Sequence, residues 1–197
     1  MKRNSRLRCC AYKVLIRGVI AIPWLCFAAA PAVCQVDKPS EDQVKAAYLY
    51  NFGRYVKWPP IAATDQARSF TICVFNEDPF GATLDAVLSR QALNGKPVVI
   101  KRIAKPQDAS GCRIAFIHVA QSDRLQDMLA SLNQNSVLTV SDMPDFLHQG
   151  GMVQFVLHDE RVRFEINLTT TTSARLTMSS ELLKVASAVI GKPQSRE

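Results

Sequence analysis

The feature that most constrains the fold is a series of short apolar runs that alternate with stretches of helical spacing. Each run is bounded by turn residues and is shorter than a typical helix, which is the pattern of buried strands. The runs are Phe70–Phe75, Val98–Ile103, Cys112–Val119 and Val137–Val140. Helical patterns follow the first and the third run. The order strand-helix-strand-strand-helix-strand favours a largely parallel sheet covered by helices.

Start and stop signals place the helices of this pattern. Ser40 with Gln43 three residues later matches a capping box, and Pro59-Pro60 ends the helix that follows. Asp78 is predicted to cap the second helix, with Pro79 at its first position. Ser122 is predicted to cap the third, whose apolar face contains Leu125, Met128, Leu129 and Leu132.

The C-terminal part departs from the alternating pattern. Met152–Leu157 and Arg161–Leu168 flank the short polar segment 158–160, which predicts an antiparallel hairpin. A last helix is predicted over Ser180–Ile190, with Gly191 at its end. We therefore predict a single α/β domain of three-layer type, with a largely parallel sheet, a C-terminal antiparallel hairpin, and helices packed on the faces of the sheet.

The first 32 residues have the organisation of a secretory signal peptide. Six basic residues and no acidic one precede the apolar run 18–30, and small residues follow it. The sequence predicts cleavage after residue 32 or after residue 34. The apolar run is shorter than the ~20 residues of a lasting membrane span, so no membrane insertion is expected after processing, and the mature protein is expected in the periplasm.

Removing the signal changes the charge of the protein. The chain has 24 basic and 17 acidic residues, and six of the basic ones lie in the signal. The mature part is therefore nearly neutral, which argues against nucleic acid as a partner. We predict a flexible start over 33–40, one domain over 41–191 and a flexible tail over 192–197.

Cysteine placement suggests one disulfide. Within the predicted domain only Cys73 and Cys112 are present, and both belong to runs expected to be neighbouring strands. An oxidising compartment permits a bridge between them. Two buried free thiols are the alternative, because cysteine also packs as a small apolar residue.

Catalytic patterns are weak, and we predict no enzyme, no metal and no cofactor. His118 lies in an apolar run, where a core role is expected, and His148 and His158 lack the spacing of a metal pair. Asp142 and Asp145 flank Pro144, where aspartate commonly supports a turn. No Gly-x-Ser-x-Gly elbow is present.

Several separated motifs resemble the YfiR family. The longest runs from Ala46 to Pro59 (AAYLYNFGRYVKWP). The others, in order, are Cys73 followed by DPFG at 78–81, LTVSD at 138–142, GGM at 150–152, RVRFEIN at 161–167, and the serine and leucine pairs at 179–180 and 182–183. Together they span nearly the whole predicted domain.

The resemblance implies a periplasmic regulator of c-di-GMP signalling and biofilm formation. Proteins of this family bind the periplasmic domain of a YfiN-like inner-membrane diguanylate cyclase and repress it. A YfiB-like lipoprotein of the OmpA family relieves the repression. The resemblance leaves open whether the protein forms a homodimer. The alternative from another functional class is a periplasmic sensor that binds a small ligand.

Four residues are candidates for partner binding: Trp58, Arg163, Glu165 and Asn167. Trp58 follows a helix whose other aromatic residues have the spacing of a core face. The other three alternate with Val162, Phe164 and Ile166, so they share one strand face about 6–7 Å apart. Such a face either contacts a partner or is simply solvated, and a surface pair between Arg163 and Glu165 would contribute less than ~1 kcal/mol.

Overall fold

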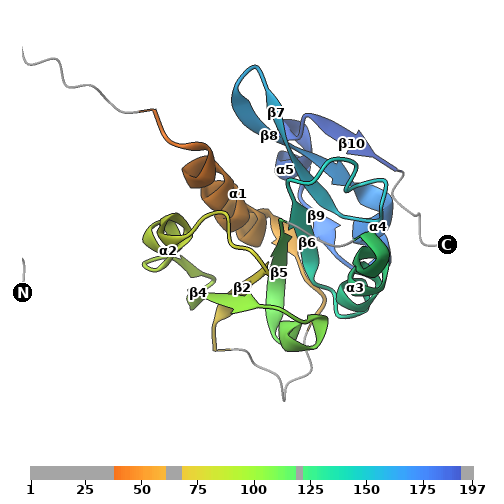
Figure 1. The fold of residues 1–197 in the computed structure, drawn as a ribbon, viewed down its shortest axis with the longest axis horizontal. Coiled ribbons are helices and arrows are strands. Elements are labelled where there is room, and N and C mark those ends of the chain that lie inside the picture. The colour runs from red at the N-terminus through yellow and green to blue at the C-terminus, as the bar shows by residue number, and fades with distance from the viewer. Residues whose placement is uncertain (1–37, 61–67, 119–121, 192–197) are drawn as a thin grey trace, which may run out of the picture. The chain divides into compact units, whose positions relative to one another are not determined.

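A mixed sheet of eight strands forms the centre of the domain (Figure 1). The structure is a computed structural model, and it describes residues 38–60, 68–118 and 122–191. The strands lie in the order β10-β8-β7-β6-β5-β2-β4-β3. They are β2 (Phe70–Phe75), β3 (Ala92–Leu93), β4 (Lys96–Ile103), β5 (Cys112–Ile117), β6 (Leu138–Ser141), β7 (Val153–His158), β8 (Arg161–Asn167) and β10 (Ala188–Ile190).

Five α-helices, one 3₁₀ helix and a small second sheet complete the described part of the chain. The helices are α1 (Glu41–Tyr55), α2 (Ala82–Leu88), η2 (Pro106–Ala109), α3 (Ser122–Gln134), α4 (Leu168–Ser173) and α5 (Ser180–Val185). The second sheet pairs β1 (Val56–Lys57) with β9 (Thr177–Met178). The single α/β fold with a mostly parallel sheet, as the sequence predicted, is therefore confirmed.

Strand β2 is the point at which the strand order reverses. The next long strand, β4, lies on one side of β2, and β5 lies on the other, both parallel to it. Strands β6 and β7 then continue the parallel arrangement beyond β5. In sheets of this kind, the carboxyl ends of the strands around such a reversal are where α/β proteins usually bind ligands.

The predicted antiparallel hairpin is confirmed as β7 and β8. They pair from Val153–Ile166 to His158–Arg161, and the two turn residues Asp159 and Glu160 both have positive φ. Two-residue turns of this type match the twist of the strands that they join. On the other side of β8, strand β10 runs parallel to it. β10 pairs only with residues 165–167, the last three residues of β8.

The two faces of the sheet are covered by different helices. On one face α1 packs its buried residues, and the rings of Tyr48 and Phe52 lie 5.1 Å from the ring of Phe164. On the other face, α3 packs Leu125, Met128 and its neighbours over β2 and β5. Each face therefore has its own apolar core.

A disulfide joins Cys73 in β2 to Cys112 at the start of β5, with the two Cα atoms 5.8 Å apart. This is the pairing favoured by the sequence. It crosslinks two adjacent central strands and closes a loop of 39 residues in sequence separation. Both cysteines are buried in the core under α3.

The predicted last helix is wrong in its second half. Helix α5 ends at Val185, Ala186 has extended backbone angles, and residues 188–190 form strand β10. The helical spacing of the apolar residues was misleading because β-branched Val189 and Ile190 suit a strand. Ser187 donates from its backbone N–H and its Oγ to the carbonyl of Phe164, which begins this pairing.

The helix start predicted at Asp78 is also wrong. Helix α2 begins at Ala82, after Gly81 at positive φ. The carboxylate of Asp78 accepts the backbone N–H of Phe80 at 2.9 Å and binds Arg102, so it supports a turn instead. The capping box of Ser40 and Gln43 is confirmed. The predictions for the signal, for residues 33–37 and for the tail over 192–197 lie outside the described residues, as does the side chain of Ser122, on which its predicted capping role depends.

Candidate functional site

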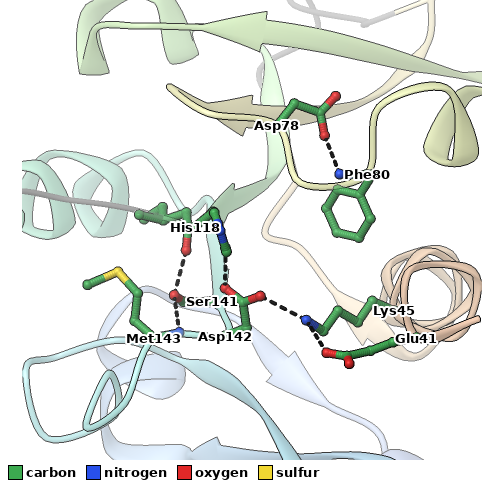
Figure 2. Close-up of polar contacts among 9 residues, drawn as sticks. Glu41, Lys45, Asp78, Phe80, His118, Ser141, Asp142 and Met143 are labelled. Carbon is green, nitrogen blue, oxygen red and sulfur yellow. Dashed lines mark hydrogen bonds and ion pairs between the residues drawn. The ribbon is translucent and has the colours of Figure 1, made fainter.

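Two polar side chains emerge where the parallel strands β5 and β6 end. His118 follows Ile117 at the end of β5, and Asp142 follows Ser141 at the end of β6. These strands are neighbours, so residues that leave their carboxyl ends meet at one edge of the sheet. The first turns of α1 lie beside the same edge and add Glu41 and Lys45 (Figure 2). We call these four residues the carboxyl-edge cluster.

Lys45 is the centre of the cluster. Its Nζ lies 2.8 Å from Oδ2 of Asp142 and 2.7 Å from Oε1 of Glu41, one helical turn earlier. The lysine is 7% exposed, because its stem lies on the face of α1 that packs against the sheet. A buried ammonium needs such partners, since an unpaired buried charge is strongly destabilising.

The protonation of Lys45 follows from these contacts. Burial alone would lower the pKa of the ammonium. Hydrogen bonds to Asp142 and Glu41, together with their negative charges, outweigh burial and raise the pKa of Lys45 above its ordinary value. The lysine is therefore held as a cation, and its role is to tie α1 to the end of β6.

His118 completes the chain of contacts. Its Nδ1 lies 2.8 Å from Oδ1 of Asp142, and an ionised carboxylate only accepts, so Nδ1 carries the proton. A carboxylate bonded to Nδ1 in this way fixes the orientation and tautomer of the histidine ring. The neighbouring hydroxyl of Ser141 donates to the carbonyl of Ile117 and accepts from the backbone of Met143 (Figure 2), so it is engaged in holding the loop.

A groove of about 340 Å³ opens beside the cluster, between α1 and the β7–β8 hairpin. Glu41, Lys45 and Asp142 form its polar wall, and Phe155, Leu157 and Val162 are among its apolar residues. No group of three metal-ligating side chains occurs in the part of the chain that the structure describes. The groove therefore combines apolar walls with charged side chains on one wall.

Trp58, a predicted partner-binding residue, lies next to the core under α1. Its ring packs edge to face on Phe70, with centroids 5.4 Å apart. Its buried indole N–H has no hydrogen-bond acceptor among the described residues. Most of its ring therefore stabilises the fold, and the unmet donor is the only feature that keeps it a candidate for a partner contact.

The three predicted residues of β8 are brought onto one face but differ in what they contact. Arg163 is exposed and Glu165 is half-buried, and neither forms an ion pair within the described ranges. The amide of Asn167 accepts the N–H of Thr170 at the start of α4 and donates to the carbonyl of Leu147. Asn167 therefore acts inside the fold, as a helix cap.

The carboxyl-edge cluster was not predicted from the sequence. A core role was expected for His118 and a turn role for Asp142, whereas the side chain of His118 is 35% exposed and bonded to Asp142. One signal was present: His118 lies at the end of the apolar run Cys112–Val119, and Asp142 follows the run Val137–Val140 after one residue. Polar residues at that position are expected to meet at one edge of a sheet.

No helix within the described ranges has the length and hydropathy needed to cross a membrane. No curated protein is significantly similar to the chain. Among solved structures, a conserved domain protein from Vibrio cholerae O1 biovar El Tor matches with a TM-score of 0.50 at 11% identity, over 77% of this chain and 60% of that one. The chain thus spans somewhat more than half of the Vibrio protein, and the likeness concerns the fold alone.

The ABC domain from Streptococcus pneumoniae, solved in complex with L-Trp, matches with a TM-score of 0.44 at 11% identity, over 64% of this chain and 56% of that one. The sequence profile described as YfiR/HmsC-like matches residues 42–187, nearly all of the described fold. That family consists of regulatory proteins, generally periplasmic regulators of diguanylate cyclases. This chain belongs to the YfiR/HmsC-like family.

Proposed function

We propose that this protein is exported to the periplasm, where it binds the periplasmic domain of an inner-membrane diguanylate cyclase and holds the enzyme inactive. The observation that carries the proposal is the family match over residues 42–187. An OmpA-like outer-membrane lipoprotein relieves the repression by binding the repressor. The protein thereby lowers c-di-GMP and limits biofilm formation.

Two features of the chain support the location. The first 32 residues combine a basic start, an apolar run and small residues, as a secretory signal does. The disulfide between Cys73 and Cys112 suits an oxidising compartment, because disulfides are rare in reducing ones. Both agree with a regulator that meets its partner outside the cytoplasm.

The surface of the hairpin supports a binding role. The face of β8 that carries Arg161 and Arg163 lies opposite the face packed on α1, and both arginines are exposed. Exposed charged residues on a rigid strand are well placed to orient a partner protein. The carboxyl-edge cluster lies at the base of the same hairpin and holds α1 in position.

The proposal is tested in the organism by gene deletion. Deleting the gene should raise cellular c-di-GMP and surface attachment, and deleting the cyclase gene as well should remove the effect. A copy of the protein without residues 1–32 should fail to complement, because the partner domain lies across the inner membrane. Deleting the lipoprotein gene alone should lower c-di-GMP.

The decisive control is expression of the cyclase. If c-di-GMP is unchanged in the deletion strain while the cyclase is present in the membrane, the repressor function is rejected.

A second candidate function is that of a periplasmic sensor for a small ligand. The groove of about 340 Å³ beside Lys45 and Asp142 favours it, because ligand pockets commonly measure about 300–1,000 Å³ and combine apolar walls with a few polar groups. Thermal-shift measurements on the mature protein with amino acids, nucleotides and dicarboxylates would test it. A shift lost in Asp142→Asn would support a ligand in this groove.

A further inference from the structure

The outer edge of β8 is left unpaired over the first half of the strand. β10 lies beside Glu165, Ile166 and Asn167 only, and the hairpin extends past the start of β10 (Figure 1). His158 and Arg161 face each other across a two-residue turn, so they exchange hydrogen bonds and the next residue, Val162, points its N–H and C=O away from β7. Within the described residues, no strand pairs with β8 at Val162.

A groove runs beside this unpaired edge. It measures about 570 Å³ and lies between the start of α1 and residues 160–163, at the turn and the start of β8. Val44, Tyr48, Leu157 and Val162 supply its apolar lining. Leu157 is 63% exposed, the largest exposed fraction among the exposed large apolar side chains of the described residues. The outward-pointing N–H and C=O of Val162 therefore lie next to an apolar surface.

The charges along the same edge are basic. Arg161 and Arg163 are exposed, alternate with buried Val162, and border the groove along β8, and Lys38 is exposed at the rim of the groove. Along the described chain none of the three forms an ion pair. Glu41 at the rim is already bonded to Lys45. Glu160 and Glu165 offset two of these three positive charges, so the surroundings of the edge carry a small net positive charge.

We propose that the outer edge of β8 binds an extended segment of a partner protein as an added strand, and that this segment alternates acidic and apolar residues. Such a strand pairs with Val162, and its side chains point alternately to the two faces of the sheet. Its apolar side chains enter the groove beside Tyr48 and Leu157, and its acidic ones meet Arg161 and Arg163. We take this partner to be the periplasmic domain of the cyclase, and that identification rests on the proposed function.

A second copy of this chain fits the edge poorly. If two copies of β8 paired antiparallel about Val162, Arg161 of each copy would face Arg163 of the other. Like charges placed directly opposite each other across strands are destabilising. The edge therefore disfavours self-association, and the same two arginines favour an acidic strand.

The test uses mature protein labelled with ¹⁵N and the peptide Glu-Val-Glu-Val-Glu, blocked at both ends. We expect saturable binding and slower exchange of the Val162 amide, while the amide of Arg163, which faces β7, serves as an internal reference. The peptide Lys-Val-Lys-Val-Lys and the rearranged peptide Glu-Glu-Glu-Val-Val should bind about tenfold more weakly or not at all.

Variants locate the binding on the protein. The double variant Arg161→Glu with Arg163→Glu should weaken binding of the acidic peptide by about tenfold, and Leu157→Ser should weaken it through loss of the apolar contact. Arg90→Glu, a charge reversal at a single exposed residue outside the groove and outside β8, should leave binding unchanged.

Equal binding of the acidic and basic peptides would overturn the inference, as would a Val162 amide that is already protected in the free protein. If deletion of the gene raises c-di-GMP but the acidic peptide does not bind, this docking site is wrong and the repressor function stands. If the peptide binds as expected but deletion has no effect, the repressor function is wrong and the edge serves another acidic partner.

Discussion

Strands β4 and β8, each second from one end of the sheet, both carry basic residues but use them differently. On β4, Arg102 binds the carboxylates of Asp78 and Asp85 at 2.7 and 2.6 Å, and Lys101 donates to the carbonyl of Asp108. On β8, Arg161 and Arg163 have no such partner in the described chain. Charges at a sheet edge commonly prevent unwanted pairing. A basic residue that is bonded within the fold is not available to a partner strand. An unbonded one can attract an acidic strand and repel a basic one.

The largest expected effect concerns the disulfide between β2 and β5, on the β4 side of the sheet. Cys73→Ser removes the disulfide to Cys112, and closing a loop of this length is worth roughly 4 kcal/mol in the chain-entropy model. The melting temperature of the mature protein should fall by about 10 °C. An unchanged melting curve under non-reducing conditions would show that the bridge adds nothing to this end of the sheet.

Loss of Lys45 should be the next largest effect. Lys45→Ala leaves Asp142 without its ammonium partner and releases Glu41, and we expect a loss of about 2 kcal/mol in the free energy of unfolding. Lys105→Ala, at an exposed lysine, should change stability by less than about 0.5 kcal/mol. Denaturant titration distinguishes the two. Equal losses would mean that the cluster does not hold α1 against the sheet.

The same lysine predicts a pH dependence. The pKa of Lys45 is raised above 10.5 in the folded protein, so folding favours the protonated form. Its contribution should be complete below about pH 10 and should disappear as the pH rises through the raised value. The difference in unfolding free energy between wild type and Lys45→Met should shrink as the pH rises above about 10. A constant difference over that range would contradict the assignment.

The smallest effect compares the two edges directly. Arg102→Ala breaks two ion pairs and should cost about 1 kcal/mol, because the arginine is partly exposed and screened by solvent. Arg163→Ala should cost less than about 0.5 kcal/mol. If both variants lose the same stability, Arg163 has a structural partner and the contrast between the edges disappears.

The fold was largely predictable, because its elements follow from local patterns. Apolar runs bounded by turn residues marked β2, β4, β5 and β6, and the short polar segment 158–160 marked the hairpin. The end of α5 was not predictable in the same way. Residues 188–190 fit a helix by spacing, and only pairing with β8 decides that they form a strand.

The candidate sites were less accessible to sequence, because they depend on which segments meet. Lys45 lies in α1, and His118 and Asp142 directly follow β5 and β6, so only the strand order brings the three together. Arg163 was chosen from its alternation with apolar residues. The unpaired backbone beside it depends on the length of β10, which no local pattern reveals.

The most direct test of the account is inhibition of the cyclase by the purified mature protein. With the full-length cyclase in lipid nanodiscs, added protein should lower the initial rate of c-di-GMP formation from GTP in a saturable way. The double variant Arg161→Glu with Arg163→Glu should inhibit about tenfold less well, and Arg90→Glu should inhibit as well as wild type. A rate that stays constant at saturating wild-type protein would contradict the central claim that this protein restrains a diguanylate cyclase.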